Sequence, residues 1–355
     1  MVRKLDHYLS GLGDRLGSLP WLDPGHLLLL GGGYGRGEGG IFKKTDGAPE
    51  LYNDLEFYLI VPAHLQKPAR HWCAEESHRG EEETGIEVEF KVMSRAAWRR
   101  SKPGMFVYDL AVGHVVVSGD RAILDELPPG AGDASQIPLH EATRLLFNRG
   151  SSLYFSGHAL RFQTERSKGA YVERVQSKLK LALADAVLAA HGGYDRSCLV
   201  RRDRALGLTG DLPPGWPAIL ALHAEGVEFK LHPRHAGGDM AESQESLRRV
   251  WADVWLWLER RRLGVVWGQL SDYALWRGDL LPGESVLRCM LLRLRDRLKY
   301  RECLPAWNEP PRACLMRALA ALHGGREDLA AAALGVPTDP QLLHDAYRRW
   351  WLRYN

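Results

Sequence analysis

The hydrophobic pattern of this chain changes its period near residue 130. Before that point apolar and polar residues alternate in short runs typical of strands, and beyond it apolar residues recur at helical intervals. The runs with a strand pattern are HLLLL (26–30), LYNDLEFYLIV (51–61), IEVEFKVM (86–93) and HVVVSG (114–119). Helical patterns cover residues 2–16 and 65–80, and later 140–162, 171–191, 244–262, 284–300, 310–323, 326–334 and 340–352. The sequence therefore predicts an α+β protein, with an N-terminal mixed-sheet domain followed by a mainly α-helical region.

Two segments rich in proline and glycine are candidate domain boundaries. They are PPGAGDASQIP (128–138) and DLPPGWP (211–217), and such compositions favour linkers and turns. We expect a first domain over residues 1–130, a helical bundle over 138–210 and a C-terminal helical region over 211–355.

The composition excludes several classes of protein. With 45% apolar residues the chain can bury a sizeable core, and 47 Lys and Arg against 44 Asp and Glu leave a net charge of only +3. That balance excludes a protein that seeks polyanions through its bulk charge. The five cysteines form no C-x-x-C motif, so neither a disulfide framework nor a zinc ribbon is expected. The sequence shows neither the apolar core of a signal peptide nor the roughly 20 apolar residues of a membrane helix. We expect a cytoplasmic protein without a membrane partner.

The first apolar run leads directly into a segment that is unusually rich in glycine. Seven of the ten residues 31–40 are glycines, which allow backbone N–H groups to approach an anion closely. The alternative is a flexible surface loop. The Gly-Lys-Ser/Thr triplet of a Walker A loop does not occur. A G-x-G-x-x-G match at Gly35, Gly37 and Gly40 is followed by only IFKKTDGAPE before the next strand, too short for the crossover helix of a dinucleotide-binding unit.

The next strand pattern carries two carboxylates on one face. Side chains alternate along a strand, so Asp54, Glu56 and Tyr58 share a side, and the two acidic residues lie about 7 Å apart. A later strand pattern places Glu87 and Glu89 together in the same way. If the two strands are neighbours, these carboxylates converge beside the glycine segment and offer the oxygen ligands that Mg²⁺ prefers. The alternative is an amphipathic sheet with a solvated acidic face.

This order of features resembles the DNA-polymerase-β-like nucleotidyltransferase superfamily. Its signature is an apolar strand, Gly-Gly or Gly-Ser, a loop, an hDh[DE]h strand and a third carboxylate on a later strand. Here Gly32-Gly33 and Asp54-Leu55-Glu56 match, with Glu89 or Glu87 in the third place. The segment GGYGRGEG (32–39) is similar to the version found in stand-alone bacterial members, which include relatives of aminoglycoside nucleotidyltransferases. The resemblance covers about residues 25–120.

The resemblance implies Mg²⁺-dependent transfer of a nucleoside monophosphate from a nucleoside triphosphate, with ATP the first candidate, to a hydroxyl acceptor. It implies two Mg²⁺ ions held by Asp54, Glu56 and Glu89, with Glu87 as the alternative third ligand. The residues that it implies for the phosphates are Gly32, Gly33, Tyr34, Arg36 and, from the helical half, Lys178. The alternative for Arg36 is a solvated loop arginine, and the alternative for Lys178 is a snorkelling surface lysine.

The chain departs from the family pattern in two respects. The stretch from Gly33 to Asp54 is longer than usual in the family, and Gly33 stands where a serine hydroxyl commonly contacts phosphate. These departures favour a second hypothesis, a non-catalytic nucleotide-binding regulator or toxin–antitoxin component. A third is an RNA-directed nucleotidyltransferase that uses the arginine-rich segment RCMLLRLRDRLKYRE (288–302). Arginines mixed with leucines at helical spacing more often form the wet face of a core helix, so nucleic acid is the less favoured partner.

Overall fold

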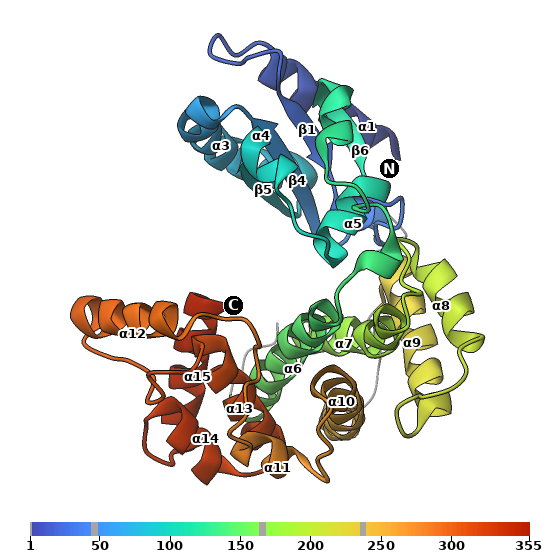
Figure 1. The fold of residues 1–355 in the computed structure, drawn as a ribbon. Coiled ribbons are helices and arrows are strands. Elements are labelled where there is room, and N and C mark those ends of the chain that lie inside the picture. The colour runs from blue at the N-terminus through green and yellow to red at the C-terminus, as the bar shows by residue number, and fades with distance from the viewer. Residues whose placement is uncertain (1, 44–48, 163–167, 235–238) are drawn as a thin grey trace. The chain divides into compact units, whose positions relative to one another are not determined.

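The computed structural model describes residues 2–43, 49–162, 168–234 and 239–355, which Figure 1 shows as a ribbon. The chain forms two compact units, each assembled from separate stretches of sequence. The first comprises Met1–Glu141, Leu188–Leu208 and His223–His235, and the second Ala142–Val187, Thr209–Leu222 and Ala236–Asn355. The continuous domains expected over 1–130, 138–210 and 211–355 stay predictions.

The first unit contains the β-structure of the described chain. Its strands are β1 (Leu27–Leu30), β2 (Ile41–Lys43), β3 (Pro49–Leu51), β4 (Asp54–Val61), β5 (Glu87–Ser94) and β6 (Val115–Gly119). Its helices are α1 (Val2–Gly17), α2 (Gly32–Gly35), α3 (Gln66–Thr84), α4 (Arg95–Arg99), α5 (Met105–Val112) and α8 (Cys198–Leu206), with the last turns of α9 (Trp216–Leu231). Short 3₁₀ turns lie at Ala63–Leu65, Arg121–Glu126 and Ala134–Gln136. The expected strands and the helices over 2–16 and 65–80 are confirmed to within a few residues.

The central sheet of the first unit is mixed, in the order β5-β4-β1-β6. β1 runs antiparallel to both β4 and β6, whereas β4 and β5 are parallel. A parallel pair needs a long crossover, which α3 provides between β4 and β5. The α+β class is therefore confirmed at the level of a mixed sheet followed by a helical remainder.

Both faces of this sheet are covered. On one face Leu55, Phe57 and Leu59 of β4 pack in a core with residues of α1 and α3, among them Leu12 and Trp72. The opposite face packs around a second core that comprises Leu27, Leu29, Tyr58, Ile60, Trp98, Leu110 and Ile123. Because β4 is central, its apolar residues are buried on both sides of the sheet. Only Asp54 and Glu56, at the start of the strand, are partly exposed to solvent.

The segment after the glycines forms a small hairpin instead of a crossover helix. β2 pairs antiparallel with β3, and Ile41 lies opposite Leu51. Residues 44–48, between the two strands, lie outside the described chain. The conclusion that IFKKTDGAPE supplies no dinucleotide-type helix is consistent with this pairing. The helical turn α2 within the glycines themselves was not expected, since glycine is a poor helix former.

All regular secondary structure in the described residues of the second unit is helical. It contains most of α6 (Leu139–Phe162) and α7 (Lys168–Ala190), the first turns of α9, and α10 to α15. The later helices are α10 (Met240–Leu263), α11 (Leu270–Leu275), α12 (Val286–Tyr300), α13 (Pro311–His323), α14 (Glu327–Leu334) and α15 (Pro340–Tyr354).

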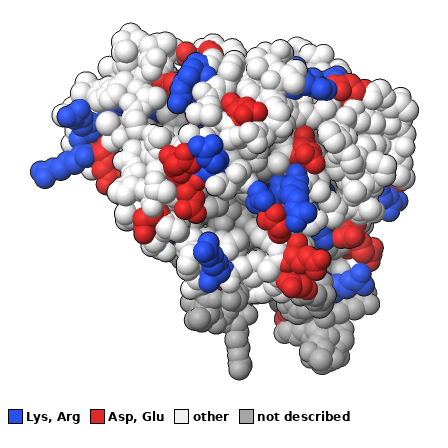
Figure 2. All heavy atoms as spheres, turned by 90° about the horizontal axis from the view of Figure 1, so that it is seen from below, with Lys and Arg blue, Asp and Glu red and all other residues white. Residues whose placement is uncertain are grey.

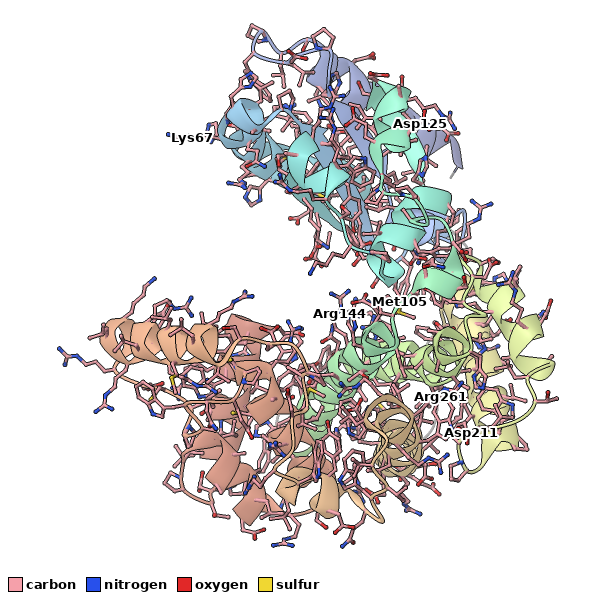
Figure 3. The ribbon with its side chains drawn as sticks, viewed as in Figure 1. Lys67, Met105, Asp125, Arg144, Asp211 and Arg261 are labelled. Atoms are coloured by element: carbon pink, nitrogen blue, oxygen red, sulfur yellow. The ribbon has the colours of Figure 1, made fainter. Side chains whose placement is uncertain are left out.

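Tryptophans and ion pairs hold α10 in the second unit. Trp251 is fully buried and donates its indole N–H to the carbonyl oxygen of Leu146 at 2.9 Å. At the C-terminal end of α10, Arg260 and Arg261 form ion pairs with Asp211 at 2.7 and 3.3 Å (Figure 3). Arginines in the last turn also oppose the negative end of the helix dipole. On the face drawn in Figure 2, positive and negative side chains are interspersed, as the balanced charge of the sequence predicts.

The arginine-rich segment folds as α12, and its burial matches the expected pattern only in part. Arg293 is fully buried, whereas leucines such as Leu287 and Leu298 are exposed. The basic residues of the segment other than Arg293 are exposed, as the interpretation predicted, but most of the leucines are exposed as well, so the expected apolar core face is wrong for this helix. The guanidinium of Arg293 is accommodated because it donates to the carbonyl oxygens of Ala306 and Glu309.

Candidate functional site

The four acidic residues singled out in the sequence lie on one face of the sheet. β4 and β5 pair directly, with Asp54 opposite Glu87 and Glu56 opposite Glu89. Residues that lie opposite each other in a sheet point to the same side, and residues two apart on one strand do so as well. The expectation that the two acidic strands are neighbours is thus confirmed, and Glu89 is the registered partner of Glu56.

Glu56 lies at the centre of this acidic group. Burial raises its pKa, the negative charge of Asp54 raises it further, and Glu89 adds a smaller effect in the same direction. Lys91 and Arg36 oppose this shift only in part. A carboxylate that is desolvated and surrounded by like charge gains from a bound cation, so this electrostatic environment suits a divalent metal.

The first glycines are held against Glu56. The N–H of Gly31 donates to the backbone oxygen of Glu56 at 2.8 Å. Gly32 has φ of +59°, and a Cβ built on it would lie 2.5 Å from Glu56 Oε2. Both facts favour glycine, because L-residues disfavour this backbone region and a Cβ would displace the end of the Glu56 side chain. The turn α2 therefore begins directly at the carboxylate.

Gly33 is under no comparable constraint. Its φ is not positive, and a Cβ there would make only ordinary contacts, the nearest at 3.5 Å from the backbone oxygen of Glu38. A serine would fit at this position. The departure from the family pattern at Gly33 is therefore not imposed by the backbone.

Tyr34 supports the glycine segment from within. Its hydroxyl donates to the carbonyl oxygen of Gly40 at 2.8 Å and accepts the N–H of Tyr52 at 2.9 Å. A Cβ on Gly39 would lie 2.1 Å from the Tyr34 ring. The side chain predicted to contact a nucleotide thus ties the glycine segment to the strand that precedes β4.

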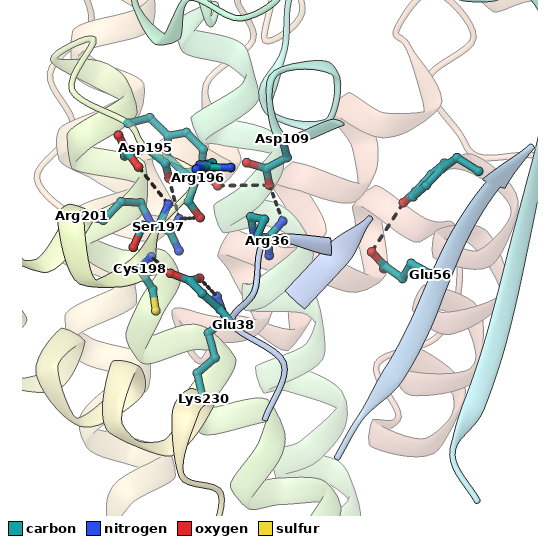
Figure 4. A network of polar contacts seen from close by, with 12 residues as sticks. Arg36, Glu38, Glu56, Asp109, Asp195, Arg196, Ser197, Cys198, Arg201 and Lys230 are labelled. Carbon is teal, nitrogen blue, oxygen red and sulfur yellow. Dashed lines mark hydrogen bonds and ion pairs between the residues drawn. The ribbon is translucent and has the colours of Figure 1, made fainter. Parts of the chain in front are cut away.

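Two charged residues of the same segment are paired inside the first unit (Figure 4). Arg36 Nη1 donates to Asp109 Oδ2 on α5 at 2.9 Å, so Arg36 is no solvated loop residue. Glu38 accepts from Lys230 Nζ at 2.6 Å and from the N–H of Cys198 at 2.7 Å. Burial alone would raise the pKa of Glu38, but the charge and hydrogen bond of Lys230 lower it below its usual range.

Sequence reasoning missed Glu38, Lys230 and Asp109. The charged pair Arg36 and Glu38 stands between glycines in GRGEG, which could have indicated an anchored loop. Their partners lie 73 and 192 residues away, and no local pattern marks them. The ion pairs of Arg36 with Asp109 and of Glu38 with Lys230 restrain both charged residues of the glycine segment, and so hold its backbone in place beside β4.

Lys178 lies on α7 in the second unit and is half-buried. Its predicted contact with the triphosphate stays a prediction. A half-buried side chain is equally consistent with the snorkelling surface lysine of the alternative hypothesis.

The fit of a metal rests on the donors in the first unit. Asp54, Glu56 and Glu89 offer only carboxylate oxygens, which suits Mg²⁺. In their present conformations Glu89 is exposed and 3.9 Å from Lys91 Nζ, and Asp54 accepts a hydrogen bond from the side chain of Asn53. Over the described part of the chain, no three or more His, Cys, Asp or Glu side chains are grouped so that they could hold a metal ion. The donor chemistry fits the ion, and the side chains would have to turn toward it.

Comparison with known proteins adds no family. Neither the models of known protein families nor the curated proteins contain a match to this chain. Among the helices that the structure describes, none combines the length and the apolar character needed to span a membrane.

Proposed function

We propose that this protein is a Mg²⁺-dependent nucleotidyltransferase that moves a nucleoside monophosphate from a nucleoside triphosphate to a hydroxyl acceptor. The observation that carries the proposal is the placement of Glu56, in register with Glu89 and in contact with the turn at Gly32. The resemblance of the GGYGRGEG and Asp54-Leu55-Glu56 segments to nucleotidyltransferases points the same way.

The side chains divide the work between metal and phosphate. Asp54 and Glu56 would hold Mg²⁺, and Glu89 would complete the ligand set from the neighbouring strand. Bound Mg²⁺ would supply charge neutralisation and Lewis-acid activation of the acceptor oxygen. The backbone N–H groups at Gly32 and Gly33 would donate to phosphate oxygens.

The internal ion pairs give these groups a fixed geometry. Arg36 and Glu38 hold the glycine segment through Asp109 and Lys230, so both act as positioning residues. In the transfer, the acceptor oxygen forms a bond to the α-phosphorus while the bond to the leaving pyrophosphate breaks. Such reactions depend mainly on positioning and on stabilising charge, and a rigid segment supplies the first of these.

The decisive experiment measures metal-dependent nucleotide binding in matched variants. Isothermal titration with Mg²⁺ and ATP, followed by the other nucleoside triphosphates, is carried out on the wild type, Asp54→Asn and Glu56→Gln. Glu82→Gln, on the exposed surface of α3, is the control for removing one carboxylate. We expect metal-dependent binding in the wild type and the control and at least a tenfold loss in both site variants. Equal binding in all four proteins would remove the proposal.

A nucleotide-binding regulator on the same fold is the second candidate, and Gly33 favours it because the segment lacks the usual serine hydroxyl. It predicts Mg²⁺-dependent binding without pyrophosphate release for any acceptor class. An RNA-directed enzyme is less favoured, since the net charge of the chain is only +3. Retention of RNA with a steep salt dependence would revive it.

A further inference from the structure

The helix α12 of the second unit exposes leucines to solvent and buries charged side chains. Four leucines lie on its solvent side, at Leu287, Leu291, Leu294 and Leu298, and the first and last are 67% and 75% exposed. At about 100° per residue these four lie within about 60° of one another around the helix. We call them the leucine ridge. The face that the helix buries carries Cys289, Arg293 and Asp296 instead.

The polar contacts of the buried face hold α12 in this orientation. Arg293 is fully buried and donates to the carbonyl oxygens of Ala306 and Glu309 at distances of 3.1 to 3.2 Å. Asp296, also fully buried, forms an ion pair with Arg295 at 2.9 Å. Turning the leucine ridge inward would pack the leucines against backbone carbonyl groups and break the hydrogen bonds of Arg293. The ridge therefore remains on the outside.

The spacing of the leucine ridge suits a second helix. The intervals between its members are four, three and four residues, which is the a/d pattern of a coiled-coil seam. Helices that lie in a membrane surface usually carry Trp or Phe on their apolar face. No aromatic residue stands in the ridge.

The charges beside the leucine ridge select the partner. In this heptad register Arg288 and Arg295 occupy e positions and Arg297 occupies a g position, and all three are exposed. Between Val286 and Tyr300 the only acidic residue is the buried Asp296. A second copy packed antiparallel on the ridge would place arginine against arginine, which is unfavourable. A helix with glutamate or aspartate at its flanking positions would meet opposite charge.

We propose that the leucine ridge of α12 is the docking surface for an amphipathic helix of a partner protein, with an apolar seam of about two heptads and acidic flanks. This inference does not depend on the proposed nucleotidyl transfer. It assigns to the segment 288–302 a protein partner in place of RNA.

The test uses the full-length protein and two synthetic helical peptides. Both carry leucine at a and d, one has glutamate and the other lysine at e and g, and each is labelled and kept below its own association concentration. We expect fluorescence anisotropy to show at least about tenfold tighter binding of the acidic peptide. Leu298→Gln should weaken that binding about tenfold, since a buried leucine contributes on that scale. Leu206→Gln, on the similarly exposed Leu206 of α8, should leave it unchanged.

Charge reversal provides an independent arm. The double variant Arg288→Glu with Arg297→Glu should exchange the preference and bind the lysine peptide more tightly. Light scattering and flotation with anionic phosphatidylglycerol vesicles test the other occupants. The proposal is overturned by equal binding of both peptides, by insensitivity to Leu298→Gln, or by a ridge-dependent dimer or vesicle association in their place.

Discussion

Gly32 offers the sharpest test of the site, because Gly37 in the same segment provides a matched control. Both glycines have positive φ, +59° at Gly32 and +75° at Gly37. Alanine in this region costs about 1–2 kcal/mol of folding free energy, offset in part by a less flexible unfolded chain. We therefore expect Gly32→Ala and Gly37→Ala to lower the free energy of unfolding by a similar amount, about 1 kcal/mol.

The two variants should differ in their effect on Glu56. A Cβ at Gly37 meets nothing within 4 Å, whereas a Cβ at Gly32 lies 2.5 Å from Glu56 Oε2. Ordinary van der Waals contact begins near 3.4 Å, whereas the Cβ would lie 2.5 Å from the carboxylate oxygen. The carboxylate would therefore have to move away by the difference, about 0.9 Å. Displacements of about 1 Å in a reactive site can reduce rates about a hundredfold.

The assay pairs urea unfolding with titration of Mg²⁺ and ATP and with pyrophosphate release. Gly32→Ala should lose at least tenfold in nucleotide affinity and more in turnover, while Gly37→Ala keeps both near the wild-type level. Equal losses in the two variants would refute the reasoning, because they would show that contact with Glu56 is irrelevant to binding.

Three further predictions follow from the same segment. Glu56→Gln should raise the thermal midpoint at pH 7 while removing nucleotide binding. The folded protein raises the pKa of Glu56, so the ionised form of this side chain opposes folding. Scanning calorimetry should show the gain in thermal midpoint vanish as pH falls through the ordinary carboxyl range. Gly33→Ser should change the free energy of unfolding by less than about 0.5 kcal/mol and tighten nucleotide binding, whereas a loss of folding would contradict the open space at its Cβ. Lys230→Met should lower the free energy of unfolding by about 3 kcal/mol because it leaves the buried Glu38 without its cation. In a double-mutant cycle, adding Glu38→Gln should recover most of this loss. The stabilising effect of that pair is present above the ordinary carboxyl range and is lost as pH falls through the lowered pKa of Glu38, so an equal loss at acid pH in the double variant would count against it.

Local pattern predicted most of the regular structure, and its failures at α5 and α2 have different physical reasons. The strand and long-helix patterns have a clear period, and they recur in the structure as β1, β4, β5, β6 and the long helices. The eight residues of α5 are too short and too apolar to distinguish a helix from a buried strand by period. The turn α2 is built from glycines, and tertiary contacts at Gly31 and Gly32 override their low helix propensity.

That Asp54 and Glu56 share one face follows from the amino-acid sequence alone, because alternation is a property of any strand. The sequence also shows directly that the strand is preceded by a dense run of glycines. The folded structure was needed to show that Glu89 lies in register with Glu56, that Glu38 forms an ion pair with Lys230, and that α12 exposes its leucines. Strand order, ion pairs between distant residues and the buried side of a helix depend on which surfaces meet when the chain packs, and a local pattern carries no information about that choice.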